Sequence, residues 1–247
     1  MTQMKQPVIK AKVDRAAKLT TFIALGCVML GSFMGCTRSK VSMTSVKDAT
    51  LYEDVAGALS NGAGQHMFAG TKGAGHLVRV LLAFDVAGKV PAGSTVTGVK
   101  LRLNMSGASA YSAQTMGLHR VLADWGEGST VAPGGGGGGG AASIGGATWL
   151  HTSFSDQFWS GPGGAFEATS SAAIDAEGIR AYEWGSTDQM VADVQMWLDN
   201  PSSNHGWLLM GNDSATSVKR FDTRENASEA NRPTLTLTFD QTRSNKK

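Results

Sequence analysis

Alternation of apolar and polar residues is the main pattern in this chain. In residues 77–86 (LVRVLLAFDV), the apolar residues Val80, Leu82 and Phe84 alternate with residues that are only partly apolar. This predicts a strand buried on one face and partly on the other. Residues 95–105 (TVTGVKLRLNM) alternate more strictly, which indicates an antiparallel sheet with one solvated face.

Shorter segments between glycine- and proline-rich turns follow the same pattern. They predict strands at 48–54, 116–122, 147–150, 179–184, 206–210, 218–223 and 233–239. Residues 187–198 instead have helical periodicity, with a capping box from Ser186 to Gln189 and a stop at Asn200-Pro201. One helix among eight or more strands predicts an all-β fold, a jelly-roll-like β-sandwich with the helix over one end.

Residues 1–36 have the layout of a bacterial secretory signal. A basic stretch precedes an apolar, uncharged segment at 19–35, and Gly35 comes directly before Cys36. Three alternatives fit: a lipoprotein signal with Cys36 lipidated, an ordinary cleaved signal, or an uncleaved anchor, because about 17 apolar residues is near the lower limit of a membrane span. All three predict an extracellular or cell-surface location. With Cys36 lipidated, the protein could be an outer-membrane lipoprotein.

The predicted domain organisation follows from this signal. We expect a linker at 37–47, the folded domain at 48–240 and a short tail at 241–247. The two cysteines, Cys27 and Cys36, lie inside or beside the signal, so the mature domain has no cysteine pair to form a disulfide. Its stability must come from a hydrophobic core.

Composition and charge narrow the classes of partner. The chain has 22 basic and 20 acidic residues, but its first 40 residues hold seven basic groups and one acidic group. The remaining 15 basic and 19 acidic residues leave the folded part with a net charge of −4. A broad basic face for nucleic acid is therefore not expected, because phosphate binding needs clustered lysine and arginine.

A glycine-rich segment, residues 133–146 (PGGGGGGGAASIGG), interrupts the strand patterns. It lacks the Lys-Ser/Thr pair and the helix that a phosphate-binding loop needs. It also has too few apolar side chains to offset the entropy of ordering. We predict a flexible loop inserted within one domain.

Several acidic turns could hold a cation. Asp124 and Glu127 flank Trp125 in the sequence DWGEG, where a structural turn, a cation site and a catalytic carboxylate pair are the alternatives. Glu53-Asp54 forms a second oxygen-rich turn that could serve calcium, although neither has EF-hand spacing. No histidine pair has a ligand-like spacing, and no Gly-x-Ser-x-Gly motif is present, so we expect a noncatalytic protein.

Aromatic and basic residues provide candidate ligand-binding groups. Trp125 and Trp159 lie in turns, where they could stack on sugar rings, burial in the core being the alternative. If the strand at 218–223 continues to Arg224, this residue lies on the same face as Arg220. Together with Arg102, these two arginines could bind the carboxylates of an acidic sugar. An ion-pair ladder within the sheet is the alternative for these charges.

Several short motifs, in this order, are similar to one known family. They are Arg79-Val-Leu-Leu-Ala-Phe-Asp85, Pro91-Ala-Gly-Ser-Thr-Val, Val99-Lys-Leu-Arg-Leu103, His119-Arg-Val-Leu-Ala-Asp-Trp-Gly-Glu127, Asn204-His-Gly-Trp207, Phe221-Asp-Thr-Arg-Glu225 and Asn231-Arg-Pro-Thr-Leu235. From Asp48 to Phe239 the chain resembles the DNRLRE domain. Members of that family are extracellular β-sandwich modules, and some recognise alginate-type polyuronates. The resemblance implies a noncatalytic sandwich for which a polysaccharide and a structural calcium ion are candidate ligands.

The function expected from these observations is that of an exported, noncatalytic surface module binding an acidic polysaccharide. The alternatives are a structural or adhesive surface module, with another surface component as its partner, and a lyase or hydrolase that uses Asp124, Glu127 or a set of histidine and arginine residues. Such modules are often joined to catalytic domains, whereas we expect this one to act in trans. The membrane is expected to be a partner only through a lipid anchor or the signal segment.

Overall fold

The computed structural model describes residues 36–211 and 216–242. The chain divides into two compact units, Met1–Phe33 and Met34–Lys247, and all described residues belong to the second. The predicted signal therefore lies outside the described residues, apart from Cys36. Within the described part of the chain, no helix is both long enough and apolar enough to cross a membrane.

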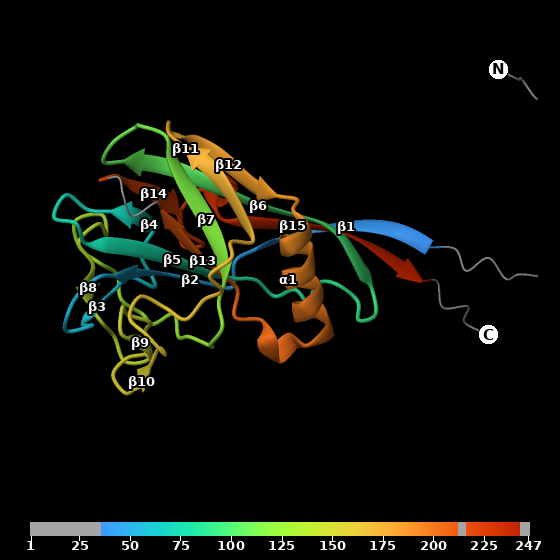
Figure 1. Cartoon of the computed structure of the whole chain (residues 1–247), viewed down its shortest axis with the longest axis horizontal. Helices are drawn as coiled ribbons and strands as arrows, with labels where there is room; N and C mark the ends of the chain where they lie inside the picture. The colour runs from blue at the N-terminus through green and yellow to red at the C-terminus, as the bar shows by residue number, and fades with distance from the viewer. Residues whose placement is uncertain (1–35, 212–215, 243–247) are drawn as a thin grey trace, which may run out of the picture. The chain divides into compact units, whose positions relative to one another are not determined.

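Antiparallel strands are the main regular secondary structure of the described residues (Figure 1). Eleven of them form one curled sheet: β1 (Cys36–Thr44), β2 (Lys47–Tyr52), β4 (His66–Thr71), β5 (Leu77–Ala83), β6 (Thr95–Ala108), β7 (Gln114–Arg120), β11 (Ala172–Ala176), β12 (Arg180–Gly185), β13 (Trp207–Gly211), β14 (Val218–Asp222) and β15 (Thr234–Thr242). Their order is β1-β15-β6-β14-β4-β5-β13-β7-β11, with β12 paired to β6 and β2 to β5. The expected all-β, sandwich-like architecture is confirmed.

Two small sheets lie outside the large one. They consist of β3 (Leu59–Ser60) with β8 (Gly140–Ala141), and β9 (His151–Ser153) with β10 (Gln157–Phe158). The strand predicted at 147–150 is wrong, because these residues form a turn before β9. The other predicted strands are present with shifted ends.

Strand β5 is buried on both faces, as its sequence predicts. Val80 and Leu82 belong to the main core inside the curled sheet. Leu81 and Ala83 point into a second core, which the long connection at 121–166 closes from outside. A strand covered on both sides needs a nearly continuous apolar run, and this explains why its alternation is weak.

The one α-helix of the described residues is α1 (Asp188–Asp199), within one position of its predicted ends. Its N-cap is Thr187, whose Oγ1 accepts a hydrogen bond from the amide of Met190. The predicted cap, Ser186, instead accepts a hydrogen bond from the amide of Val99 on β6. The helix presents a buried apolar stripe to the main core, as amphipathic periodicity requires: Met190, Val194, Trp197 and Leu198.

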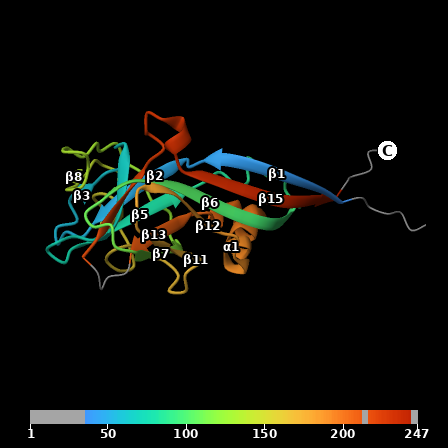
Figure 2. The same ribbon diagram turned by 90° about the horizontal axis from the view of Figure 1, so that it is seen from above.

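The linker predicted at 37–47 is wrong. Most of it forms β1, which pairs with β15 along its whole length, from Cys36 opposite Thr242 to Thr44 opposite Thr234. Figure 2 shows the two strands running together as a ribbon. Because most β1 side chains are exposed, its sequence lacks the apolar alternation that identifies a half-buried strand.

The glycine-rich segment at 133–146, called the glycine run below, packs against the sheet. It does not form the free loop that was predicted. The hydroxyl of Tyr52 donates a hydrogen bond to the carbonyl of Gly136. Gly139 has a φ of +77°, and a Cβ there would approach the Tyr52 ring to 3.1 Å. Glycine is required at this position by both its backbone angle and the close packing, which sequence composition does not reveal.

Gly206, directly before β13, provides a test of backbone packing. It has a φ of +78°, and a Cβ would lie 1.9 Å from the carbonyl oxygen of Leu82. We expect Gly206→Ala to lower the free energy of unfolding by about 2–3 kcal/mol, measured by urea denaturation. Gly93→Ala is the matched control, since Gly93 has a φ of +77° and nothing within 4 Å of a Cβ. Equal losses in the two variants would contradict the steric explanation.

Candidate functional site

The two tryptophans predicted to stack on sugars are not available for stacking. Trp125 and Trp159 are 3% and 6% exposed, and both belong to the second core. Their indole Nε1 atoms donate to backbone carbonyls of His205 and Thr148, at 2.9 Å in each case. The prediction of sugar stacking is wrong for both residues, because the long connection at 121–166 folds them inward.

The predicted arginine face is also not assembled. Arg102 donates to the carbonyl of Ala230 at 2.9 Å. Strand β14 ends at Asp222, so Arg224 lies in the following turn and not on a strand face beside Arg220. The structure thus separates the three arginines, and Arg220 borders a groove.

The four predicted metal ligands, in the turns Glu53-Asp54 and Asp124-Glu127, have different partners in the structure. Glu53 accepts a hydrogen bond from the amide of Leu77, and Asp54 accepts one from the amide of Ala58. Asp124 pairs with Lys47 at 3.0 Å. The first two carboxylates therefore bind backbone amides, and the third forms a surface ion pair. Only the fourth, Glu127, lies in an acidic cluster.

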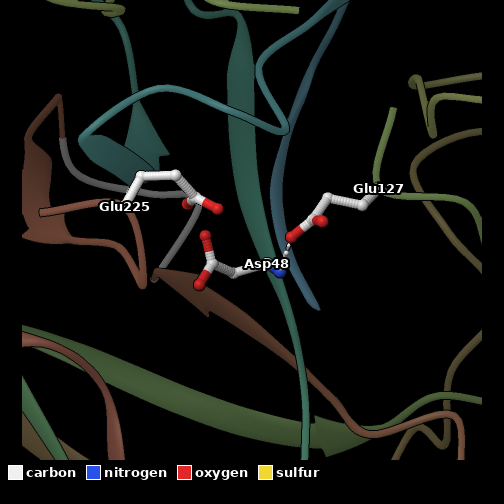
Figure 3. Close-up of side chains that lie close together, drawn as sticks. All are labelled: Asp48, Glu127 and Glu225. Atoms are coloured by element: carbon white, nitrogen blue, oxygen red, sulfur yellow. Dashed lines mark hydrogen bonds between the residues drawn. The ribbon is translucent and has the colours of Figure 1, made fainter. Parts of the chain in front are cut away.

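That cluster joins Asp48, Glu127 and Glu225 from three separate segments, as Figure 3 shows. One carboxylate oxygen of each residue lies within 4.8 Å of the others. Asp48 begins the buried part of β2 and is 1% exposed. Its amide donates to Glu127 at 2.9 Å, which fixes the two groups side by side.

Arg224 is the cation of this cluster. Its Nε and Nη2 donate to the two carboxylate oxygens of Glu127 at 2.8 and 2.6 Å, and Nη2 also lies 2.9 Å from Glu225. Burial raises the pKa of Asp48 to about 7, and the charges of Glu225 and Glu127 act in the same direction. Burial likewise raises the pKa of Glu225, opposed by Arg224. The site therefore disfavours three ionised carboxylates beside one guanidinium.

A surface groove lies where β4, β6 and β14 meet the glycine run. Its volume is about 650 Å³. Four separate segments line it: Lys72 follows β4, Tyr111 follows β6, Arg220 lies on β14, and Gly137-Gly138 belong to the glycine run. Tyr111 is 58% exposed, which makes it an accessible aromatic ring. The glycines leave the groove open because they have no side chains.

Two cations border this groove. Lys72 Nζ lies 4.9 Å from the centroid of the Tyr52 ring, and burial lowers the pKa of Lys72. Arg220 donates from Nε and Nη2 to Ser106, which also lines the groove. Within residues 36–211 and 216–242, neither cation forms a salt bridge with a carboxylate. Their positive charge is available to an anionic ligand.

Sequence reasoning identified Arg220 but missed Lys72 and Tyr111. Both lie in connections between strands, where hydrophobic periodicity carries no information. The available signal was a lone tyrosine among small residues (GASAYSA), since such neighbours have little side-chain surface with which to bury the ring. Asp48 was missed because it lies at the start of an ordinary strand pattern.

Comparisons with known proteins assign no family. A scan against models of protein families finds no match to this chain, and a search of curated proteins finds no relative. The similarity to the DNRLRE domain therefore remains a prediction from the motifs.

Proposed function

We propose that this protein is an exported, noncatalytic surface module that binds an acidic polysaccharide of the polyuronate type, as the DNRLRE resemblance implies. The binding site in this proposal is the groove between β4, β6, β14 and the glycine run. The observation that carries it is the placement of an exposed aromatic ring, Tyr111, in a groove bordered by Lys72 and Arg220.

The chemistry of these three residues suits a uronate chain. The C–H face of a sugar ring packs on an aromatic ring such as that of Tyr111. A uronate carboxylate then pairs with a lysine or with the planar guanidinium of an arginine. The groove is open to solvent and not an enclosed cavity, which leaves room for a chain to continue beyond it.

The proposed export gives this groove an orientation. Cys36 is exposed and begins β1, whose free end lies far from β4 and β14 (Figure 1). A lipid on Cys36 would attach the protein through the β1–β15 ribbon and leave the groove facing away from the membrane. We propose this arrangement as the cell-surface form.

The second candidate is a structural or adhesive surface module without a glycan ligand. It is favoured by one observation: among the described strands, β1 pairs only with β15 and leaves its other edge open. An open strand edge can pair with another chain. Arg38 and Lys40 on β1 oppose this pairing, because positive charge on an edge strand disfavours association.

Tyr111→Ala tests the glycan proposal. We expect its Kd for alginate oligosaccharides to rise about 5- to 10-fold, because the stacking surface is removed. Lys72→Gln should weaken binding less and reduce its dependence on salt, since one screened charge pair is lost. Both constants are measured by isothermal titration calorimetry with the full chain in mild detergent.

Matched variants control for nonspecific effects. Phe158→Ala removes an aromatic residue that is 62% exposed in β10, outside the groove, and Lys100→Gln removes a cation paired with Glu183. Both should bind like the parent chain. If the folded parent protein binds neither alginate, pectate nor neutral glycans, the glycan proposal is wrong. The structural or adhesive role would then be favoured.

A further inference from the structure

Two carboxylate oxygens of the acidic cluster accept no hydrogen bond from any of the described residues. Asp48 Oδ2 accepts from the hydroxyl of Ser45 and the amide of Arg224, whereas Asp48 Oδ1 is buried without a partner among residues 36–211 and 216–242. Glu225 Oε2 is likewise buried without a hydrogen-bond partner in that part of the chain. In Figure 3 the carboxylates of Asp48 and Glu225 face one another across a short gap.

The formal charges of this cluster do not balance. Asp48, Glu127 and Glu225 carry −3 when ionised, and Arg224 supplies +1. Lys47, which precedes Asp48 on β2, bonds to the Asp124 carboxylate and the Trp125 carbonyl and not to this cluster. Two buried oxygens without donors and an excess of two negative charges cost free energy unless a cation or protons compensate.

We propose that Asp48 and Glu225 bind one calcium-class divalent cation, with Glu127 holding Arg224 beside it. The donors are all hard oxygens, which Ca²⁺ prefers and which soft metals do not. Calcium–oxygen distances of about 2.3–2.6 Å place ligands on opposite sides of the ion about 5 Å apart, and the three oxygens of the cluster lie within 4.8 Å. Water completes the coordination, since Glu127 is already occupied by Arg224.

This site ties three distant parts of the chain together. Asp48 lies on β2, Glu127 on the long connection after β7, and Glu225 on the turn after β14. A bound cation therefore stabilises the folded form alone, because the unfolded chain does not hold these residues together. The inference concerns stability and does not depend on glycan binding in the groove.

The test is a calcium titration of the full chain, purified in mild detergent and stripped with a chelator. We expect calorimetry to detect binding of one Ca²⁺ and about 1 mM CaCl₂ to raise Tm by about 3 °C or more. Glu225→Gln keeps the size of the side chain and should lose most of this shift. Its Tm without calcium should equal or exceed that of the stripped parent, since one unbalanced charge is removed.

Glu183→Gln is the matched control, because Glu183 is exposed and pairs with Lys100 on the surface. It should keep the full calcium response, whereas Asp48→Asn should lose it. Three results would overturn the proposal: no heat or Tm shift with calcium in the parent chain, an unchanged shift in Glu225→Gln, or tighter binding of Mg²⁺ than of Ca²⁺. A proton shared by Asp48 and Glu225 predicts the first of these results.

Discussion

Replacing Asp193 with alanine is expected to lower the free energy of unfolding by about 3–4 kcal/mol. Asp193 lies on α1 and is 0% exposed. Its carboxylate accepts hydrogen bonds from the hydroxyl of Ser171, the indole of Trp207 and the amide of Gln189, and Arg120 lies 3.4 Å away. Alanine removes the shared acceptor and leaves buried donors unpaired. Urea denaturation followed by tryptophan fluorescence measures the loss.

Two variants calibrate this result. Asp193→Asn keeps one acceptor oxygen and should cost less than alanine. Asp199→Ala, on the exposed end of the same helix, should change stability by less than about 0.5 kcal/mol, because the Asp199 carboxylate is at the surface and accepts a hydrogen bond from Gln195 on the same helix. A loss for Asp193→Ala no larger than that of Asp199→Ala would show that the buried network contributes little.

Replacing Arg224 with alanine should lower the free energy of unfolding by about 2–3 kcal/mol in calcium-free buffer. The variant removes the only cation paired with Glu127 and Glu225 among the described residues. Their carboxylates, together with that of Asp48, then repel one another in a partly buried site. The value is below that of a fully buried pair because the Arg224 side chain is 36% exposed.

Lys100→Ala is the control for Arg224→Ala, because Lys100 and its partner Glu183 are both about half exposed. It should cost less than about 0.5 kcal/mol. Alginate binding by folded Arg224→Ala should be unchanged, since Arg224 does not line the groove. Weaker binding would contradict the separation of the two sites and return Arg224 to the ligand-contacting residues.

Periodic segments were predictable because their pattern reports burial directly. Strands β5 and β6 were predictable because the positions of their apolar side chains show which faces are buried. Helix α1 was predictable because its apolar residues recur with the 3.6-residue period of a helix. Strand β1 was not predictable, because an exposed strand is held by backbone hydrogen bonds to β15, and these depend little on side-chain identity.

The candidate sites depended on tertiary structure. A tryptophan in a turn has the same sequence signal whether it is exposed or buried, and the connection at 121–166 decided that Trp125 is buried. The acidic cluster combines residues separated by 79 to 177 positions, Asp48, Glu127 and Glu225, as the numbering shows.

The sequence by itself determined the all-β class, the single helix and the doubly buried central strand. These features depend on the solvation of neighbouring side chains, which a local pattern records. Only the tertiary structure decided which charges meet and which rings remain exposed. Those outcomes depend on how loops cross the sheet, as with Glu127 at Asp48 and with Lys72 and Tyr111 in the lining of one groove. Loop paths are set by long-range packing and contacts that no local period encodes.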